Sequence, residues 1–289
     1  MNVLIWAGEK IKIYMNKELS FKVTRWIIFV LVAIAIAVPV IIHERIKLPD
    51  TSSRVVKNIY DKIESLPERA PIIISVDFDP SSDEELRPMV KAVLRHAFRK
   101  NLRVIGMTIW DAAAGGTLIS IMNEIGKEAG KQDGVDYAIM PFKPGGGSII
   151  MLLSQNFFEA YAKDYKDRNN KTLAVFNGIQ TLKDMKFAID IAAGSTIDVW
   201  IVYGKEKAKM PLGAGCTGVM ATDYYPFLQS GQLLGLMGGL SSAAQYETLI
   251  QHKDTATESM KPQTVVHALI ILLIIVGNIV YFVGKKKKV

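Results

Sequence analysis

The chain has little cysteine and little histidine, and each shortage excludes a class of structure or site. Cys216 is the one cysteine in 289 residues, so no disulfide can form within the chain. Only four histidines are present, and no stretch has the pattern of a zinc site, a haem motif or a catalytic triad. Any folded domain must therefore rely on a packed core, and we expect no cofactor.

Excess charge is also missing from the central part of the chain. The formal net charge is +7, from 35 Lys and Arg against 28 Asp and Glu. Residues 1–25 contain five Lys or Arg and two Glu, and residues 285–289 contain four Lys, which leaves 26 charges of each sign in between. A nucleic-acid-binding domain concentrates basic residues on its own fold. We therefore expect no nucleic-acid partner, and the basic tails need another explanation.

Two long apolar runs provide it. Residues 26–42 read WIIFVLVAIAIAVPVII, and residues 265–283 form a second run that ends at four lysines. Each is about long enough to cross a hydrocarbon core of roughly 30 Å as a helix. A cleaved signal peptide is the alternative for the first run, but its exit has no small-residue cleavage site. The predicted organisation is a basic tail at 1–25, a transmembrane helix at 26–42, an α/β domain at 43–264, a second transmembrane helix at 265–284 and a tail at 285–289.

The basic tails also predict an orientation. Lysine and arginine close to membrane spans are retained on the cytoplasmic side. We expect both termini in the cytoplasm, the central domain on the outer face of the cell membrane, and the bilayer itself as one partner. For residues 1–25, an interfacial segment and a disordered tail are both open.

The central region predicts a parallel sheet. A helix over residues 54–66 is expected to form a membrane-proximal stalk. Strands and helices then alternate with short turns, which is typical of a Rossmann-like, mostly parallel sheet with helices on both faces. The expected strands are 72–76, 102–109 and 135–142. A helix is expected to begin at a capping box formed by Ser82 and Glu85, and two more are expected over 117–131 and 145–161.

The second half is less regular. Residues 186–191 and 212–221 are expected to be strands, while 196–203 fits either a helix or a strand. We expect a turn at 223–226, a helix interrupted by glycine at 232–250 and a polar linker at 252–263. The glycines of 232–250 indicate close backbone packing.

Two carboxylates at the end of the first strand are the main catalytic candidates. Asp77 and Asp79 are spaced as in the first motif of haloacid-dehalogenase-like phosphatases, where such a pair holds Mg²⁺ or supplies a nucleophile and an acid. Asp111 and Asp190 are possible additional ligands. In the alternative, structural interpretation, Asp79 starts a turn before Pro80 and Asp77 caps backbone amides.

Glycine-rich segments after two strands are the ligand-binding candidates. Bare amides at a helix N-terminus form a cradle for a small anion, unless the glycines merely make tight turns. The eight candidates are Lys143, Gly145, Gly146, Gly147, Ser148, Gly194, Ser195 and Thr196. Cys216 lies in a third segment, where a buried small side chain is favoured over a nucleophile.

The stretches PIIISVDFDPSSDEELRPMVKAVLRHAFRKNLRVIGMTIW and LGAGCTGVMATDYYPFLQSGQLLGLMGGLSSAAQYE resemble a family of prokaryotic membrane proteins with a Rossmann-like domain between two transmembrane helices. The resemblance covers most of the central domain and implies no activity.

Three functions follow as hypotheses. The leading one is a non-enzymatic, membrane-anchored subunit or scaffold that associates with other membrane proteins or with copies of itself. Gly277 and Asn278 in the second run suit contacts between helices. The alternatives are a tethered receptor for a small anion and a metal-assisted hydrolase that uses Asp77 and Asp79.

Overall fold

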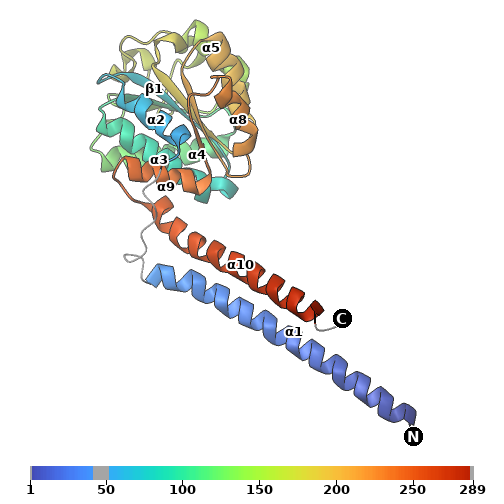
Figure 1. Cartoon of the computed structure of the whole chain (residues 1–289). Coiled ribbons are helices and arrows are strands. Elements are labelled where there is room, and N and C mark those ends of the chain that lie inside the picture. Colours follow the sequence, from blue (N-terminus) through green and yellow to red (C-terminus); the bar gives the residue numbers. More distant parts are fainter. Residues whose placement is uncertain (1, 42–51, 287–289) are drawn as a thin grey trace. The chain divides into compact units, whose positions relative to one another are not determined.

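The computed structural model describes the backbone of residues 2–41 and 52–286 and the side chains of residues 22–41 and 52–279. The chain divides into two units (Figure 1). One contains the N-terminal residues and the C-terminal residues from Glu258, and the other is the compact domain Asp50–Thr257.

Two helices of the first unit are long and apolar enough to cross a membrane. They are α1 (Asn2–Ile41), with the candidate span Lys22–Ile41, and α10 (Thr255–Lys286), with the candidate span Thr255–Ile279. In the most apolar 18-residue window of each span, none of the second and 11% of the first is buried, unlike the core helix of a soluble protein. Residues 2–25 continue α1 as helix. The linker expected at 252–263 is wrong, because α10 already starts at Thr255. The expected domain start at residue 43 lies outside the described residues.

The predicted α/β fold is confirmed. Six parallel strands form one sheet in the order β3-β2-β1-β4-β5-β6. They are β1 (Pro71–Asp77), β2 (Arg103–Met107), β3 (Tyr137–Ile139), β4 (Phe187–Ala192), β5 (Leu212–Cys216) and β6 (Leu236–Gly238). All of β1 and β4 is buried, which explains why these strands read as apolar runs without alternation.

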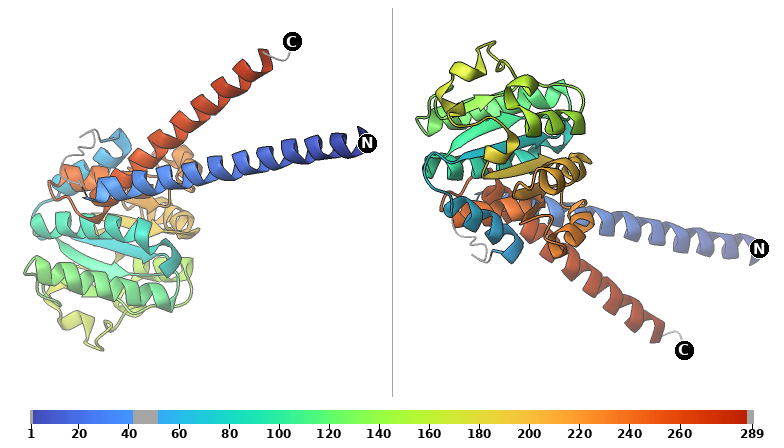
Figure 2. Two further views of the ribbon diagram at one scale, coloured as in Figure 1. Left: turned by 90° about the horizontal axis from the view of Figure 1, so that it is seen from below. Right: turned by 90° about the horizontal axis from the view of Figure 1, so that it is seen from above.

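Helices cover both faces of the sheet (Figure 2). The first face is covered by α5 (Gly147–Gln155), α6 (Phe157–Ala160), α7 (Thr196–Val199), the π-helix η6 (Trp200–Lys207) and α8 (Ala221–Gln229). The second face is covered by α2 (Arg54–Glu64), α3 (Asp83–Arg99), α4 (Ala112–Glu128) and α9 (Gly239–Leu249). Short 3₁₀ turns complete the domain at Pro80–Ser82, Asn170–Thr172, Ala174–Phe176 and Leu182–Asp184.

The expected stalk helix is instead part of the core. In α2, Val56, Ile59 and Ile63 are fully buried. Ile59 lies against both Gly213 and Gly235, where an added Cβ would come within about 3.5 Å of its side chain. The apolar periodicity of 54–66 was interpreted correctly as a helix, but its apolar face packs on the second face of the sheet.

Several local expectations are wrong for identifiable reasons. The turn at 223–226 is inside α8, because burial of Tyr224 and Ala221 outweighs the helix-breaking tendency of Pro226. Residues 232–250 contain β6 as well as α9. The glycines flanking β6 do serve close packing, since a Cβ on Gly238 would meet that of Ala221 at 2.5 Å.

Capping explains two more differences. The helix expected from residue 117 starts at Ala112, because the Asp111 carboxylate accepts a hydrogen bond from the Ala114 amide at 2.7 Å. The capping box on Ser82 does not form. Its Glu85 carboxylate instead accepts a hydrogen bond from the Gly218 amide at 2.8 Å, so Glu85 ties α3 to the loop after β5. The helix expected at 145–161 is divided at Asn156, which caps α6. Residues 196–203, left open by the sequence, are helical in α7 and η6.

Candidate functional site

The strand order reverses between β1 and β4. In an open parallel sheet, this reversal leaves a crevice beyond the carboxyl ends of the two strands. Asp190 in β4 pairs in register with Ser75 in β1, and Ala192 pairs with Asp77. Because registered residues of parallel strands point to the same face, Ser75, Asp77 and Asp190 all face the first face of the sheet. Two buried carboxyl groups therefore lie diagonally across the reversal point.

Asp77 is fully buried, and of the two carboxyl groups it is the one that accepts hydrogen bonds from the protein. Its Oδ1 atom accepts hydrogen bonds from the Thr108 hydroxyl at 2.8 Å and from the amides of Ile109 and Trp110 at 2.7 and 3.0 Å. Its Oδ2 atom accepts one from the Ser75 hydroxyl at 2.5 Å. Four donors thus replace water around this carboxylate, and they tie the end of β1 to the loop after β2.

Asp190 is equally buried, but its surroundings are different. Within the described part of the chain, no group makes a well-formed hydrogen bond to either carboxyl oxygen, although Asp77 and Thr196 lie close enough to affect its titration. Burial and then the proximity of Asp77 raise the pKa of Asp190 well above its ordinary value. Two adjacent carboxylates in a dry site cannot both remain charged, so Asp190 is the member of the pair that holds the proton.

More buried polar groups without partners lie on the same face. Among the described side chains, the Thr196 hydroxyl, the Tyr161 hydroxyl and the Trp200 indole nitrogen have no hydrogen-bond partner. Burial, together with the negative charge of Asp77, raises the pKa of Tyr161, which places that phenol near the pair. Buried polar atoms are nearly always hydrogen-bonded in folded proteins. The unpartnered hydroxyls of Thr196 and Tyr161, which lie near the acid pair, mark a place where a polar ligand or ordered water fits.

Asp79 does not join this pair. It is partly exposed and caps the 3₁₀ turn Pro80–Ser82, and its Oδ1 accepts hydrogen bonds from the amide and hydroxyl of Ser81. Those hydrogen bonds lower the pKa of Asp79.

The other acidic candidates also have structural roles. Asp77 caps backbone amides, as in the structural interpretation of the sequence. Asp111 is held at the start of α4. Among the described residues, no three His, Cys, Asp or Glu side chains gather in a group that would hold a metal ion.

The glycine segment after β3 is largely engaged in its own turn. Gly145 and Gly146 have positive φ values, and their carbonyls accept hydrogen bonds from the amides of Ser148 and Ile149. A Cβ on Gly147 would overlap the ring of Tyr203 in η6, so this glycine serves close packing. The Lys143 ammonium donates to the Ala160 carbonyl at 2.5 Å. These amides and this cation are therefore less available for an anion than the sequence predicts.

The segment after β4 borders the acid pair more closely. Ser195 precedes α7, a helix of only four residues, and Thr196 starts it with its unpartnered hydroxyl. Gly194 lies under the indole of Trp110, which a Cβ there would meet at 2.7 Å. The Tyr224 hydroxyl, 3.5 Å from the Gly194 carbonyl, closes the other side. Trp110, which is 39% exposed, is thus the outer cover of this end of the crevice.

Cys216 is fully buried, as predicted, at the end of β5. Burial raises its pKa to about 12, and this thiol is not a nucleophile at neutral pH.

Sequence reasoning noticed Asp190 only as a possible metal ligand and did not single out Thr108, Tyr161 or Trp200. One signal was available. Asp190 is the only charged residue of the buried strand FAIDIA, where a carboxyl group requires a partner or a proton. Tyr161 and Trp200 look like ordinary core aromatics, and only the fold shows that their polar atoms lack partners.

Comparison with known proteins adds no relative: no family description, no curated protein and no solved structure matches this chain. The fold and site themselves define a doubly wound α/β domain with a buried acid pair at its strand-order reversal.

Proposed function

We propose that the protein is a membrane-anchored, non-enzymatic receptor whose domain binds a small polar molecule in the crevice between β1 and β4. The observation that carries the proposal is Asp190, a buried carboxyl group without a well-formed hydrogen bond, at the position where doubly wound sheets bind ligands. The hydroxyls of Thr196 and Tyr161 are further groups available to the ligand.

The chemistry of these groups selects the ligand class. A protonated Asp190 and the hydroxyls of Thr196 and Tyr161 are hydrogen-bond donors, so the ligand presents several oxygen acceptors. The neighbouring Asp77 carboxylate disfavours a second negative charge in the same dry space. The ligand is therefore neutral and oxygen-rich, in contrast to the small anion expected from the glycine segments. The ligand enters past Trp110, which is partly exposed and lies over Gly194.

The test is native mass spectrometry of the full chain, solubilised gently, followed by identification of any small molecule released on denaturation. We expect a neutral, oxygen-rich compound bound one to one. Asp190→Ala and Thr196→Val are expected to lose it, while Asp83→Asn retains it. Asp83 is the matched control because it also carries an unpartnered buried oxygen but lies on α3, on the other face. A chain that carries no compound, or carries it equally in all variants, contradicts the proposal.

A role as a subunit of a membrane complex is the second candidate, and a surface feature favours it. Five large apolar side chains are exposed within residues 52–257, namely Trp110, Met151, Val202, Val219 and Tyr225. Three of them lie on helices of the first face, Trp110 and Val219 lie in loops at the carboxyl ends of strands, and none lies on α2, α3, α4 or α9. Val219 is 87% exposed. A one-sided set of this kind is typical of a protein contact, here with another membrane protein.

A photoreactive residue in place of Val219 tests this candidate. Cross-linking in intact membranes is expected to yield one defined heavier species, and the same substitution at Lys127, exposed on α4, is expected to yield none. A product of twice the chain mass identifies a homo-oligomer instead. No product at position 219 contradicts the subunit role and leaves the receptor proposal standing.

We also infer that both termini are cytoplasmic and that the domain faces outward, because the basic residues in excess lie in the two tails. Because Cys216 is buried, the native chain should not react with thiol reagents, and it serves as the background for thiol labelling. Lys127→Cys is expected to react with a membrane-impermeant maleimide on intact cells, and the native chain is not. Labelling of this variant only after cell lysis overturns the orientation.

A further inference from the structure

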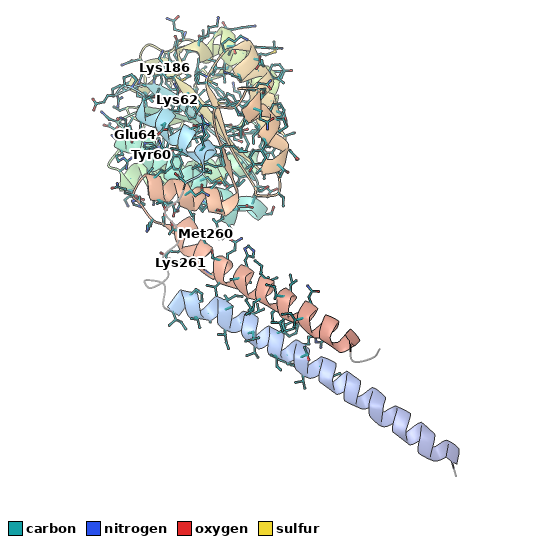
Figure 3. The ribbon with its side chains drawn as sticks, viewed as in Figure 1. Tyr60, Lys62, Glu64, Lys186, Met260 and Lys261 are labelled. Carbon is teal, nitrogen blue, oxygen red and sulfur yellow. The ribbon has the colours of Figure 1, made fainter. Side chains whose placement is uncertain are left out.

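A groove of about 640 Å³ lies at the opposite edge of the domain, where the strands begin. It is formed by the end of α2, the segment before β4 and the segment before β5. Five lysines line it: Lys62, Lys183, Lys186, Lys207 and Lys209. Figure 3 labels Lys62 and Lys186, which come from α2 and from the segment before β4. This edge is remote from the carboxyl ends of the strands and from Asp190.

The groove combines a positive rim with an apolar floor. Leu66, Met185 and Met210 line it and are at most 7% exposed, whereas Lys183, Lys186, Lys207 and Lys209 are exposed. No Asp or Glu is among the described residues that line it. Two carboxylates lie near the rim: Glu206 is 3.9 Å from Lys209, and Asp184 lies close enough to Lys186 to interact with it electrostatically. The central region carries equal numbers of positive and negative residues, so the cluster of lysines at this groove does not follow from the overall charge of the domain.

Helix termini explain only part of this arrangement. Lys62 and Lys207 lie in the last turns of α2 and η6, where a positive charge is favourable in any case. Lys183 lies in the last turn of the 3₁₀ element Leu182–Asp184, whereas Lys186 precedes β4 and lies at no helix end. Lys209 follows Ala208, the C-cap of η6, and adopts φ +60°, the left-handed conformation in which helices commonly end and which glycine adopts with less strain than lysine.

We propose that this groove binds a phosphate-bearing anion with two or more negative charges. Lysine ammonium groups act as compact point charges that suit phosphate oxygens. Five of them around one groove match the charge of a di- or triphosphate group, or of a phosphomonoester lipid headgroup whose first methylenes meet the apolar floor. This anion site is separate from the neutral-ligand crevice and does not depend on it.

The experiment uses the full chain in a neutral detergent at low ionic strength, with sodium tripolyphosphate as the probe. We expect a concentration-dependent rise in the melting temperature that weakens as salt is added. Lys186→Gln and Lys209→Gly are each expected to weaken binding by about tenfold, as loss of one close ion pair does. Lys209→Gly also removes the backbone strain, so its own melting temperature should rise rather than fall. Reduced binding in a stabilised protein excludes misfolding as the cause.

Lys127→Gln is the matched control, because it removes one exposed positive charge on α4 and should leave binding unchanged. A second arm places the chain in nanodiscs with or without phosphatidic acid. If the lipid headgroup is the natural occupant, phosphatidic acid abolishes the response to tripolyphosphate. A free phosphate compound is the occupant if the response persists. No rise in melting temperature in detergent, or equal rises in all variants, overturns the proposal.

Discussion

Asp77 and Asp190 lie on the same face of adjacent strands, fully buried, and the internal hydrogen bonds go to Asp77 alone. Asp77 accepts four of them, while neither oxygen of Asp190 has a well-formed one among the described residues. Asp77 therefore has a structural role, whereas Asp190 is a protonated carboxyl group that is available to bind a ligand. This asymmetry leads to the first two predictions.

Truncation of the two residues should have unequal effects on stability. Asp77→Ala leaves the Ile109 amide and two hydroxyls without their acceptor and leaves the Trp110 amide only the Thr108 hydroxyl, and should lower the free energy of unfolding by on the order of 3–5 kcal/mol. Asp190→Ala removes a buried polar group that makes no well-formed hydrogen bond, and should cost only about 1–2 kcal/mol or less. Urea unfolding of the solubilised chain, followed by the circular dichroism of the domain, measures both. Equal losses would mean that Asp190 has a partner of equal strength.

Asp190 also makes stability depend on pH in a defined direction. Its pKa is raised in the folded state, so the folded domain retains a proton that the unfolded chain releases above a pH of about 4. The stabilising contribution is complete below that pH and is lost as the pH rises through the folded pKa, at about 1.4 kcal/mol per unit. Asp190→Asn should flatten this decline. A melting temperature that declines identically in both proteins between pH 5 and 9 would contradict the protonated state.

His96 should control acid stability. It is fully buried on α3, where the Tyr246 hydroxyl and the Glu64 carboxylate lie 2.8 and 2.9 Å from its two ring nitrogens. Burial lowers the pKa of His96 to about 4, below its ordinary value of 6.5, despite the opposing effect of Glu64. Between pH of about 6.5 and about 4, His96 is therefore protonated in the unfolded chain but neutral in the folded domain. The free energy of unfolding should fall as the pH drops through this range.

His96→Gln preserves a donor and an acceptor without this titration. It should lower the stability at pH 7 by about 1–2 kcal/mol and make the loss between pH 6.5 and 4 smaller. Chemical unfolding at several pH values gives the comparison. Glu64, whose pKa is lowered to about 2, adds its own loss only below about pH 4.5, so the two effects separate in pH.

Gly194 should position Trp110 over the crevice. A Cβ at this position would meet the indole at 2.7 Å, and Gly194→Ala is expected to displace the ring outward and shift its fluorescence to longer wavelength. Gly116→Ala is the control, because its Cβ meets no atom within 4 Å and the residue lies inside α4. It should stabilise the domain by up to about 1 kcal/mol without a spectral change. Subtraction of Trp110→Phe spectra isolates the signal.

The sequence determined the parts of this protein that depend on local chemistry. The apolar runs identified two helices able to span a membrane, and short buried apolar runs located β1, β2, β4 and the start of β5. Strand–helix alternation then gave the α/β class, because parallel strands need such connections. The asymmetric structural roles of Asp77 and Asp79 were also open to prediction, since each follows from a strand end beside a proline turn.

Tertiary structure decided what depends on which strands become neighbours. Nothing local places β4 beside β1, and without that pairing Asp190 is one polar residue in an apolar strand rather than the partner of Asp77. The same holds for β6, where Gly235 before the strand allows the close approach of α2 and Gly238 at its end that of α8. It holds too for the groove of five lysines, whose side chains come from three segments more than 100 residues apart at the extremes. Local propensity acts over a few residues, whereas pairing, burial and shared protons are properties of contacts that only the completed sheet creates.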